Sequence, residues 1–186
     1  MKPLLFPNEF SKMSVPAVTL TDINRADATR FVALVGGVFE HTPWVAMRAF
    51  GARPFSTRDA LHAAMMTAVT AATPVEQLAL IRAHPELAGH EAMDGAMTAD
   101  STSEQGRLGL TALPRAEFAR ITQANRAYGE KFGFPCIVAL KLHQSRDTVL
   151  AEMERRLLND RDTEIANALT QIKHITGARL QKLITN

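Results

Sequence analysis

The sequence predicts an all-α fold, in a single compact domain of roughly seven to nine helices. Two observations support this prediction. Apolar residues recur at helical spacing along most of the chain, most regularly between residues 163 and 184. Helix-start signals recur as well, whereas no set of alternating apolar and polar residues indicates a group of strands.

A length of 186 residues fits one domain with a sizeable core. Residues 1–20 contain three prolines and show little periodicity, so we interpret them as an N-terminal extension. Residues 21–186 then form the predicted helical domain.

Four helices are predicted in the first half of the domain. Each begins at a capping side chain or at a proline suited to the first helical turn, and the expected ranges are 24–39, 42–50, 56–72 and 73–83. Asn24 is the expected cap of the first helix, and Gly36-Gly37 within it indicates close packing against a neighbour. Thr73-Pro74-Val75-Glu76 is a capping box, and Pro85 ends the fourth helix near His84.

Four more helices are expected at about 101–110, 114–132, 145–158 and 163–184. Ser101-Thr102-Ser103-Glu104 matches a second capping box, and Gly133 suits the left-handed cap of the long helix before it. Residues 88–100 are expected to be an irregular loop or a short helix. The apolar stretch 135–142 is expected to be a buried extended segment or the start of a helix.

Composition excludes several classes of protein. The formal net charge is only +2 and no run of five Lys or Arg residues occurs, so we expect no nucleic-acid partner. No apolar run reaches the length of a membrane-spanning helix, and the N-terminus does not match a signal peptide. The single cysteine, Cys136, rules out an internal disulfide and fits a reducing compartment. We therefore expect a cytoplasmic protein with neither a nucleic-acid nor a membrane partner.

His84 is the first candidate for chemistry. A histidine at a helix end can simply bond to a carbonyl group or interact with the helix dipole. It can also act as a general acid or base, because its pKa lies near neutral pH. The rigid turn that Pro85 imposes would fix the ring at a pocket wall, so both interpretations stay open.

Glu104 also has two interpretations. At the fourth position of the capping box it would accept a hydrogen bond from the amide of Ser101. Alternatively, its carboxylate would set the charge and tautomer of His84. The exposed N–H groups at the predicted helix start could also hold an anion.

Arg179 is singled out by periodicity. At about 100° per residue it lies near the middle of an apolar face of the last helix. A guanidinium that points inward must be paired. Its partner is either a carboxylate of the protein, in a structural salt bridge, or an anionic ligand bound through two parallel hydrogen bonds.

Other candidates are weaker. A metal site would draw on acidic and histidine side chains whose spacing matches no standard motif, namely His84, Glu86, His90, Glu91 and Asp94. Cys136 beside Pro135 reads as a core residue rather than as a nucleophile. Ser101 or Ser103 with His84 lacks the nucleophile-elbow pattern of hydrolases, and no phosphate-binding glycine motif is present.

Six short segments in one order resemble the 2-oxo-4-hydroxy-4-carboxy-5-ureidoimidazoline (OHCU) decarboxylase family of urate degradation. The likeness covers about residues 18–183. The motifs are Gly37-Val38-Phe39-Glu40-His41-Thr42-Pro43-Trp44, His84-Pro85-Glu86-Leu87-Ala88-Gly89, Ser101-Thr102-Ser103-Glu104-Gln105, Phe132-Gly133-Phe134-Pro135, and the C-terminal pair Arg155-Arg156-Leu157-Leu158-Asn159-Asp160 and Ala178-Arg179-Leu180.

The resemblance implies a helical carboxy-lyase that forms (S)-allantoin without a cofactor or metal, often as a homodimer. The family's catalytic residues correspond to His84 and Glu104. Its substrate-binding positions correspond to Pro85, Ser101, Gln105, Arg179 and the backbone amides of Cys136, Ile137 and Val138. The family often has a bulkier apolar residue in place of Cys136, so one wall of the pocket is expected to differ.

The family's substrate suits this set of residues. Its carboxylate is next to an imine-like carbon, which can accept the electrons released with CO2. Two rival interpretations remain: a metal-dependent hydrolase that uses His84, Glu86 and His90, and a non-catalytic helical binding domain. In a non-catalytic binding domain, Arg179 would not be expected to lie next to the His84-Pro85 turn.

Overall fold

The computed structural model describes residues 18–89, 92 and 94–185. These residues contain nine α-helices, which confirms the predicted fold class. The helices are α1 (Leu20–Arg25), α2 (Ala28–Val35), α3 (Trp44–Ala49), α4 (Arg58–Thr70), α5 (Pro74–Arg82), α7 (Ala99–Arg107), α8 (Arg115–Phe132), α9 (Arg146–Arg156) and α10 (Arg161–Leu183). Short 3-10 helices are η1 (Gly36–Val38), η2 (Phe50–Ala52) and η3 (Leu140–Leu142).

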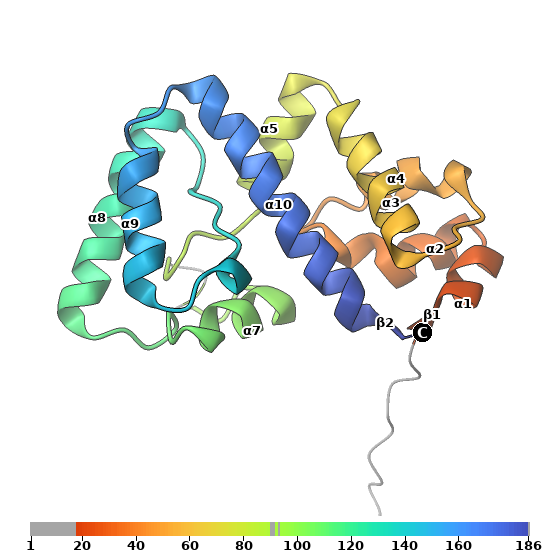
Figure 1. Ribbon diagram of the computed structural model, residues 1–186, viewed down its shortest axis with the longest axis horizontal. Coiled ribbons are helices and arrows are strands. Elements are labelled where there is room, and N and C mark those ends of the chain that lie inside the picture. Colours follow the sequence, from red (N-terminus) through yellow and green to blue (C-terminus); the bar gives the residue numbers. More distant parts are fainter. Residues whose placement is uncertain (1–17, 90–91, 93, 186) are drawn as a thin grey trace, which may run out of the picture.

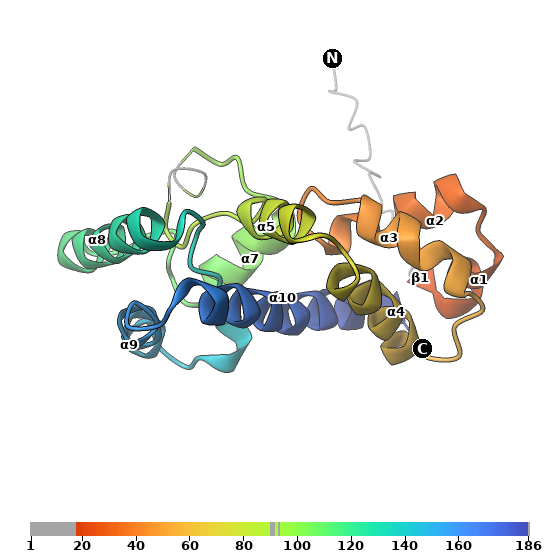
Figure 2. The ribbon, with the colours of Figure 1, turned by 90° about the horizontal axis from the view of Figure 1, so that it is seen from above.

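The long helix α10 organises the molecule. It runs diagonally across the centre, with α1 to α4 on one side and α8 and α9 on the other (Figure 1). It contacts both α4 and α5. Seen from above, α5 and α7 lie over α10, close to its middle (Figure 2). A side chain on the middle of α10 can therefore meet residues from both halves of the chain.

Several predicted helix ends are confirmed because they depend only on local chemistry. Thr73 and Glu76 form the predicted capping box of α5. Gly133 ends α8 with a φ of 77°, in the left-handed region that favours glycine. The side chain of Ser145 accepts from the amide of Thr148 and caps α9.

The predicted start of the first helix was wrong. Asn24 lies inside α1, which is capped by Thr19, and Asp27 caps a separate helix, α2. The side chain of Asn24 instead bonds to both backbone groups of Phe55, at 2.8 and 2.9 Å. Gly36 does not lie inside α2 but begins η1, because the helix ends at Val35. A long-range contact thus outweighs the local capping preference of asparagine.

The predicted capping box at Ser101 was also wrong. Helix α7 begins three residues earlier, and the side chain of Thr98 caps it by accepting from the amide of Ser101 at 3.3 Å. Ser101 and Glu104 both lie within the helix, where their side chains are directed toward other elements. The exposed N–H groups predicted at Ser101 are therefore not available to an anion at that point.

Two short strands were not predicted. β1 (Val18–Thr19) pairs in parallel with β2 (Ile184–Thr185), which joins the two ends of the described chain. We expected the helical domain to begin after residue 20. In the structure, β1 and the first residue of α1, Leu20, already lie before that boundary. Residues 135–139 form a buried extended segment, one of the two predicted alternatives.

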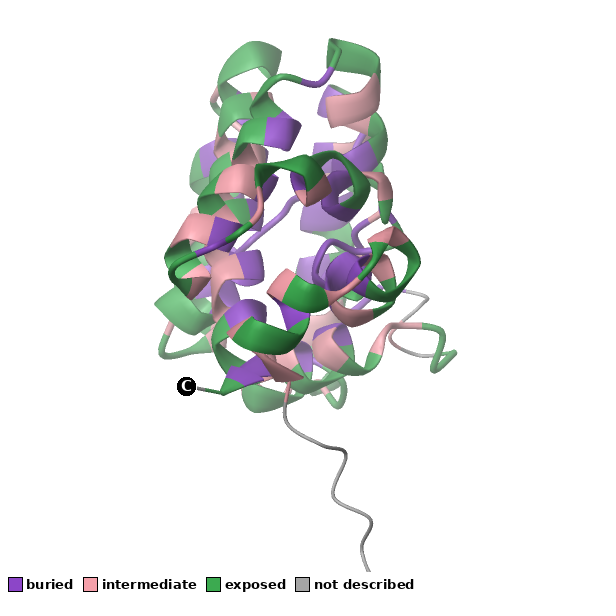
Figure 3. Cartoon of the chain, turned by 90° about the vertical axis from the view of Figure 1, so that its right-hand side faces the viewer, coloured by how far each residue is buried: buried purple, intermediate pink, exposed green. Residues whose placement is uncertain are grey.

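The core is formed mainly by aliphatic and aromatic residues. Figure 3 marks the buried positions along the chain. On the described part of the chain, no single helix is long and apolar enough to cross a membrane. The pair α4 and α5 meets that test of length and composition together, but the two helices are bent by 117°. Their apolar residues Leu61, Met65, Val69, Leu80 and Ile81 lie in the core.

Candidate active site

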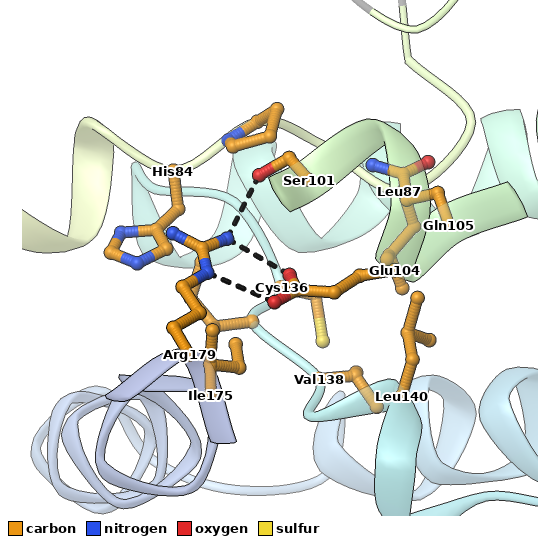
Figure 4. Close-up of a pocket in the computed structure, with 12 residues that line it drawn as sticks. His84, Leu87, Ser101, Glu104, Gln105, Cys136, Val138, Leu140, Ile175 and Arg179 are labelled. Carbon is orange, nitrogen blue, oxygen red and sulfur yellow. Dashed lines mark hydrogen bonds and ion pairs between the residues drawn. The ribbon is translucent and has the colours of Figure 1, made fainter. Parts of the chain in front are cut away.

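All nine residues predicted for the site line a single cavity. It lies between the turn after α5, the helix α7, the extended segment after α8, and the C-terminal half of α10 (Figure 4). The lining residues are His84, Pro85, Leu87, Ser101, Glu104, Gln105, Cys136, Ile137, Val138, Leu140, Ile175 and Arg179. Sequence positions almost a hundred residues apart thus meet at one point.

The turn that carries His84 and Pro85 is fixed by hydrogen bonds from two helices. The side chain of Gln105 accepts from the amide of Ala88 at 2.8 Å and donates to the carbonyl of Glu86 at 3.1 Å. Asn125 donates to the carbonyl of Leu87 at 2.8 Å. Gln105 lines the cavity, but these bonds show that it also holds the shape of the turn.

Glycine at position 89 is required by close packing within this turn. A Cβ atom there would lie 2.7 Å from the Cβ of Glu86, which is closer than side chains tolerate. Ala88 just before it has a φ of 49°, in the left-handed region. The tight backbone path sets the position of the turn relative to α5, and with it the position of the His84 ring.

His84 is held neutral with one free nitrogen. Its Nδ1 lies 3.0 Å from the carbonyl oxygen of Leu80, so Nδ1 carries the proton and donates it. Its Nε2 is buried and has no hydrogen-bond partner within the described residues. Burial lowers the pKa of His84 to about 4. The side chain therefore presents a lone pair at Nε2 at neutral pH.

The tautomer of His84 is thus set by Leu80, and not by Glu104 as one prediction had it. Glu104 instead forms a two-pronged ion pair with Arg179, in which Nε and one terminal nitrogen each lie 2.9 Å from a carboxylate oxygen. Figure 4 shows the two groups joined by dashed lines, with Ser101 bound to the same guanidinium. The capping interpretation of Glu104 is excluded by the same geometry.

Arg179 is buried in the apolar face of α10, as its spacing predicted. Besides the pair with Glu104, it donates to Glu40 at 3.0 Å and to the hydroxyl of Ser101 at 3.1 Å. The remaining contact is a long one, 3.4 Å to the carbonyl of Val38. The carboxylates of Glu104 and Glu40 raise the pKa of Arg179 against the opposing effect of burial.

Glu40 was missed as a site residue. Its side chain is only 1% exposed and accepts hydrogen bonds from Ser101, Thr98 and Arg179. Burial alone would raise the pKa of Glu40, but the charge of Arg179 and these hydrogen bonds lower it below the usual value. A carboxylate directly after the apolar Val38-Phe39 pair, inside a motif of the resemblance, was the signal that could have identified it.

The extended segment forms the wall opposite Arg179. The amide N–H groups of Cys136, Ile137 and Val138 make no hydrogen bond with any described residue, so they are free to bind a polar group. Burial raises the pKa of Cys136 to about 12, so its thiol stays protonated at neutral pH. This agrees with the interpretation of Cys136 as a core residue rather than a nucleophile.

A second buried ion pair holds this wall in place. Arg156, which is fully buried, donates to Glu164 at 2.8 Å and to the carbonyl of Ile137 at 2.6 Å. Tyr128 donates to the same carboxylate and accepts from Arg156 at 3.2 Å. Because this pair fixes the Ile137 carbonyl, it also orients the neighbouring amides. The sequence places Arg156 in one of the motifs of the resemblance but indicates no role for it.

The charges in and around the cavity sum to about −1. Arg179 contributes a positive charge, Glu40 and Glu104 each contribute a negative one, and His84 is neutral at its lowered pKa. The cavity has a volume of only about 30 Å³, far below the roughly 300 Å³ of typical small-molecule sites. The arrangement offers a base, a guanidinium that binds carboxylates, and free amides, in a volume smaller than a ring-sized ligand.

The alternative metal site finds no support in the described residues. Among them, no three His, Cys, Asp or Glu side chains are close enough together to hold a metal ion. Two of the ligands considered for it, His90 and Glu91, lie outside the part of the chain that the structure describes.

Comparison with known proteins points to the family that the motifs resembled. The profile of the OHCU decarboxylase family matches residues 24–181. The chain is 40% identical over 166 residues to the 2-oxo-4-hydroxy-4-carboxy-5-ureidoimidazoline decarboxylase of Halalkalicoccus jeotgali, covering 89% of this chain and 92% of that protein. The Mus musculus protein of the same name is 34% identical over 165 residues, with coverages of 89% and 92%.

Two solved structures share the fold. A crystal structure of (S)-allantoin synthase matches with a TM-score of 0.70 and 27% identity over 90% of this chain; the chain spans 54% of that protein. A crystal structure of OHCU decarboxylase in the presence of (S)-allantoin matches with a TM-score of 0.64 and 18% identity, over 87% of this chain and all of that one. The match of the family profile to most of the chain, together with the relatives above 30% identity, shows that the chain belongs to the OHCU decarboxylase family.

Proposed function

We propose that the protein decarboxylates OHCU and forms (S)-allantoin, as a carbon–carbon lyase of urate degradation that needs no cofactor. The observation that carries the proposal is the pairing of two groups on one cavity. A neutral, buried histidine offers a free lone pair at Nε2, and a buried guanidinium beside it already holds a carboxylate, that of Glu104, in a two-pronged fork. Decarboxylation of a hydroxy acid needs both a proton acceptor and a carboxylate-binding group.

In this mechanism His84 acts as the base. The C–C bond to the carboxylate breaks and CO2 leaves. The electron pair of that bond forms a double bond to the adjacent imine-like carbon, and the displaced C=N pair goes to the ring nitrogen, which takes the one proton consumed overall from solvent. Nε2 of His84 accepts the proton of the hydroxyl group, which becomes the ring carbonyl. Returning a proton to one face of the ureido-bearing carbon sets the hand of the product. A histidine whose pKa is lowered to about 4 starts this cycle in the required neutral form.

Arg179 and the wall of Cys136, Ile137 and Val138 would bind the substrate. The guanidinium suits the carboxylate, and the free amides suit the carbonyl oxygens of the ring, where charge develops as the bond breaks. Ser101 would hold Arg179 in position, while Pro85 and Gln105 would shape the turn beneath the substrate.

Glu104 would be the second catalytic residue. Its side chain is 22% exposed, whereas those of Arg179 and Glu40 are almost completely buried. Of the two carboxylates bound to Arg179, it is therefore the one with freedom to exchange its partner for the substrate. Once displaced it can contact the hydroxyl group or the returning proton.

The test generates the unstable substrate from urate with the two preceding enzymes of the pathway and follows (S)-allantoin by circular dichroism. Adding the protein should speed formation of the S enantiomer well beyond the spontaneous rate, and His84→Asn should not. A rate equal to the spontaneous one, from folded protein, contradicts the proposal. Activity that requires stoichiometric zinc would favour the hydrolase alternative and remove the cofactor-free claim.

The proposal also includes a homodimer, a cytoplasmic location, and the absence of nucleic-acid and membrane partners. The resemblance supports the dimer, and the single cysteine and mild charge support the rest. Light scattering of the purified protein tests the dimer directly, because a monomer mass at micromolar concentration would contradict it.

A further inference from the structure

A second cavity adjoins the site and carries a positive charge. This outer cavity has a volume of about 240 Å³ and lies between α7, η3 and the C-terminal part of α10. Its lining includes Ser103, Glu104, Arg107, Leu140, Lys141 and Lys182. Glu104 and Leu140 also line the inner cavity, as does Ile175, so the two spaces share a wall.

The three cations of the outer cavity have no carboxylate partner within the described residues. Arg107 donates to the carbonyl groups of Leu140 and His143, which leaves its charge uncompensated. Lys141 and Lys182 are exposed and form no ion pair with any described residue. The only carboxylate on the lining is Glu104, and it is directed toward Arg179.

The inner cavity has the opposite character. At about 30 Å³ it has room for only about two water molecules, and its charges sum to about −1. An anion arriving there meets repulsion as long as Glu104 stays bound to Arg179. Movement of Glu104 toward the outer cavity would enlarge the inner one and bring its carboxylate to three unpaired cations.

We propose that the outer cavity is an anion-binding vestibule through which a small carboxylate reaches His84, and that Glu104 is the movable wall between the two cavities. The incoming carboxylate first lies among Arg107, Lys141 and Lys182. It then takes the place of Glu104 on Arg179, while the Glu104 carboxylate moves to the wall that the two cavities share, with the cations on one side and the bound ligand on the other. This inference rests on the proposed function for the identity of the anion, but not for the existence of the vestibule.

The kinetic test reverses one charge at a time. Lys182→Glu and Lys141→Glu should each lower kcat/KM about fivefold at about 20 mM ionic strength and leave kcat within about twofold. The difference from the unmodified protein should vanish at about 0.5 M salt, since exposed charges are screened there. Lys173→Glu is the matched control for Lys182→Glu. Both lysines are exposed on α10, but Lys173 does not line the outer cavity.

Two outcomes would overturn the proposal. In one, the cavity variants behave like Lys173→Glu; in the other, their loss persists at high salt. A completely inactive wild-type protein would instead contradict the proposed function, and the vestibule then needs a test that does not depend on activity.

Alkylation of an introduced cysteine provides that test. Ser103→Cys places a thiol on the vestibule wall, and Thr170→Cys places one at an exposed position of α10 away from it. The ratio of the rates with iodoacetate and iodoacetamide reports the local potential, since the two reagents differ in charge. The ratio should be at least about threefold higher at position 103. Equal ratios at both positions would rule out an anion-attracting vestibule. The native Cys136 is buried with a raised pKa and contributes little background.

Discussion

Replacing Arg179 by methionine should destabilise the protein, in addition to any effect on activity. The variant keeps an apolar chain on the buried face of α10 but removes the guanidinium that neutralises Glu40 and Glu104. Glu104 can turn toward solvent, because its side chain is 22% exposed. Glu40 cannot, because it is 1% exposed, and it keeps only its bonds from Ser101 and Thr98.

The loss in the free energy of unfolding depends on whether Glu40 stays ionised or takes up a proton. Stranding a buried carboxylate costs about 3–5 kcal/mol. Protonation limits this cost, because neutralising a carboxyl group with an ordinary pKa of about 4.3 at pH 7 requires about 4 kcal/mol. In the variant the folded pKa of Glu40 lies above the unfolded one, so the penalty is greatest at neutral pH. It should shrink by about 1.4 kcal/mol for each pH unit below 7.

Urea unfolding followed by circular dichroism measures this effect at pH 7 and at pH 5.5. We expect Arg179→Met to lose about 3–4 kcal/mol at pH 7 and about 2 kcal/mol less at pH 5.5. Adding Glu40→Gln should recover part of the loss. Arg126→Met is the control, because its ion pair with Glu130 is exposed and its loss should leave the free energy of unfolding almost unchanged. A loss below about 1 kcal/mol at pH 7, or one that is independent of pH, would refute the reasoning.

Three further predictions concern His84 and Glu104. His84→Asn should lower kcat by about 100- to 10,000-fold and change the melting temperature little, with both turnover and thermal unfolding followed by circular dichroism. Near-normal turnover would show that His84 is not the base. Glu104→Gln should lower kcat/KM by at least about 100-fold without a large loss of stability, because the residue is partly exposed and caps no helix; a normal rate would make Glu104 structural. The folded pKa of His84 is about 4, below the unfolded value of about 6.5, so the stability it contributes is complete above pH 6.5 and falls by about 3 kcal/mol as pH drops from 6.5 to 4. His84→Asn should remove that part of the pH dependence, and an unchanged acid limb would contradict the assignment.

The sequence predicted well those features that depend only on residues within one helix, such as its caps and its buried face. Thr73 and Ser145 cap their helices because the chain around them offers no competing partner. Arg179 was found from periodicity alone, since a buried stripe of α10 continues on both sides of it. The same reasoning applies to Arg156, which follows Val149 and Met153 at helical spacing on α9, and it would have identified that buried cation too.

The features that the sequence did not predict depend on contacts between distant segments. Ser101 has the side chain of a helix cap, but its hydroxyl bonds to Glu40, 61 residues earlier, and the capping role goes to Thr98. Asn24 likewise bonds to Phe55 rather than to its own helix. Local capping contributes about 1 kcal/mol, so a buried hydrogen bond to a charged group, at about 1.5–3 kcal/mol, outweighs it.

The two carboxylates that bind Arg179 have different roles: one stabilises the buried guanidinium permanently, and the other can be displaced by a ligand. A guanidinium buried alone would cost several kcal/mol, so a permanent partner is required, and Glu40 supplies it from a position closed to solvent. If Glu40 took both faces of the fork, no donor would remain for a substrate carboxylate. Glu104 binds the second face from a partly exposed position and therefore can be displaced. In the proposed function, every bound anion would have to compete with Glu104, which would weaken affinity but keep the donors aligned for the transition state. The difference in exposure between Glu40 and Glu104 would thus allow the ligand-free site to be stable and still accept an anion at Arg179.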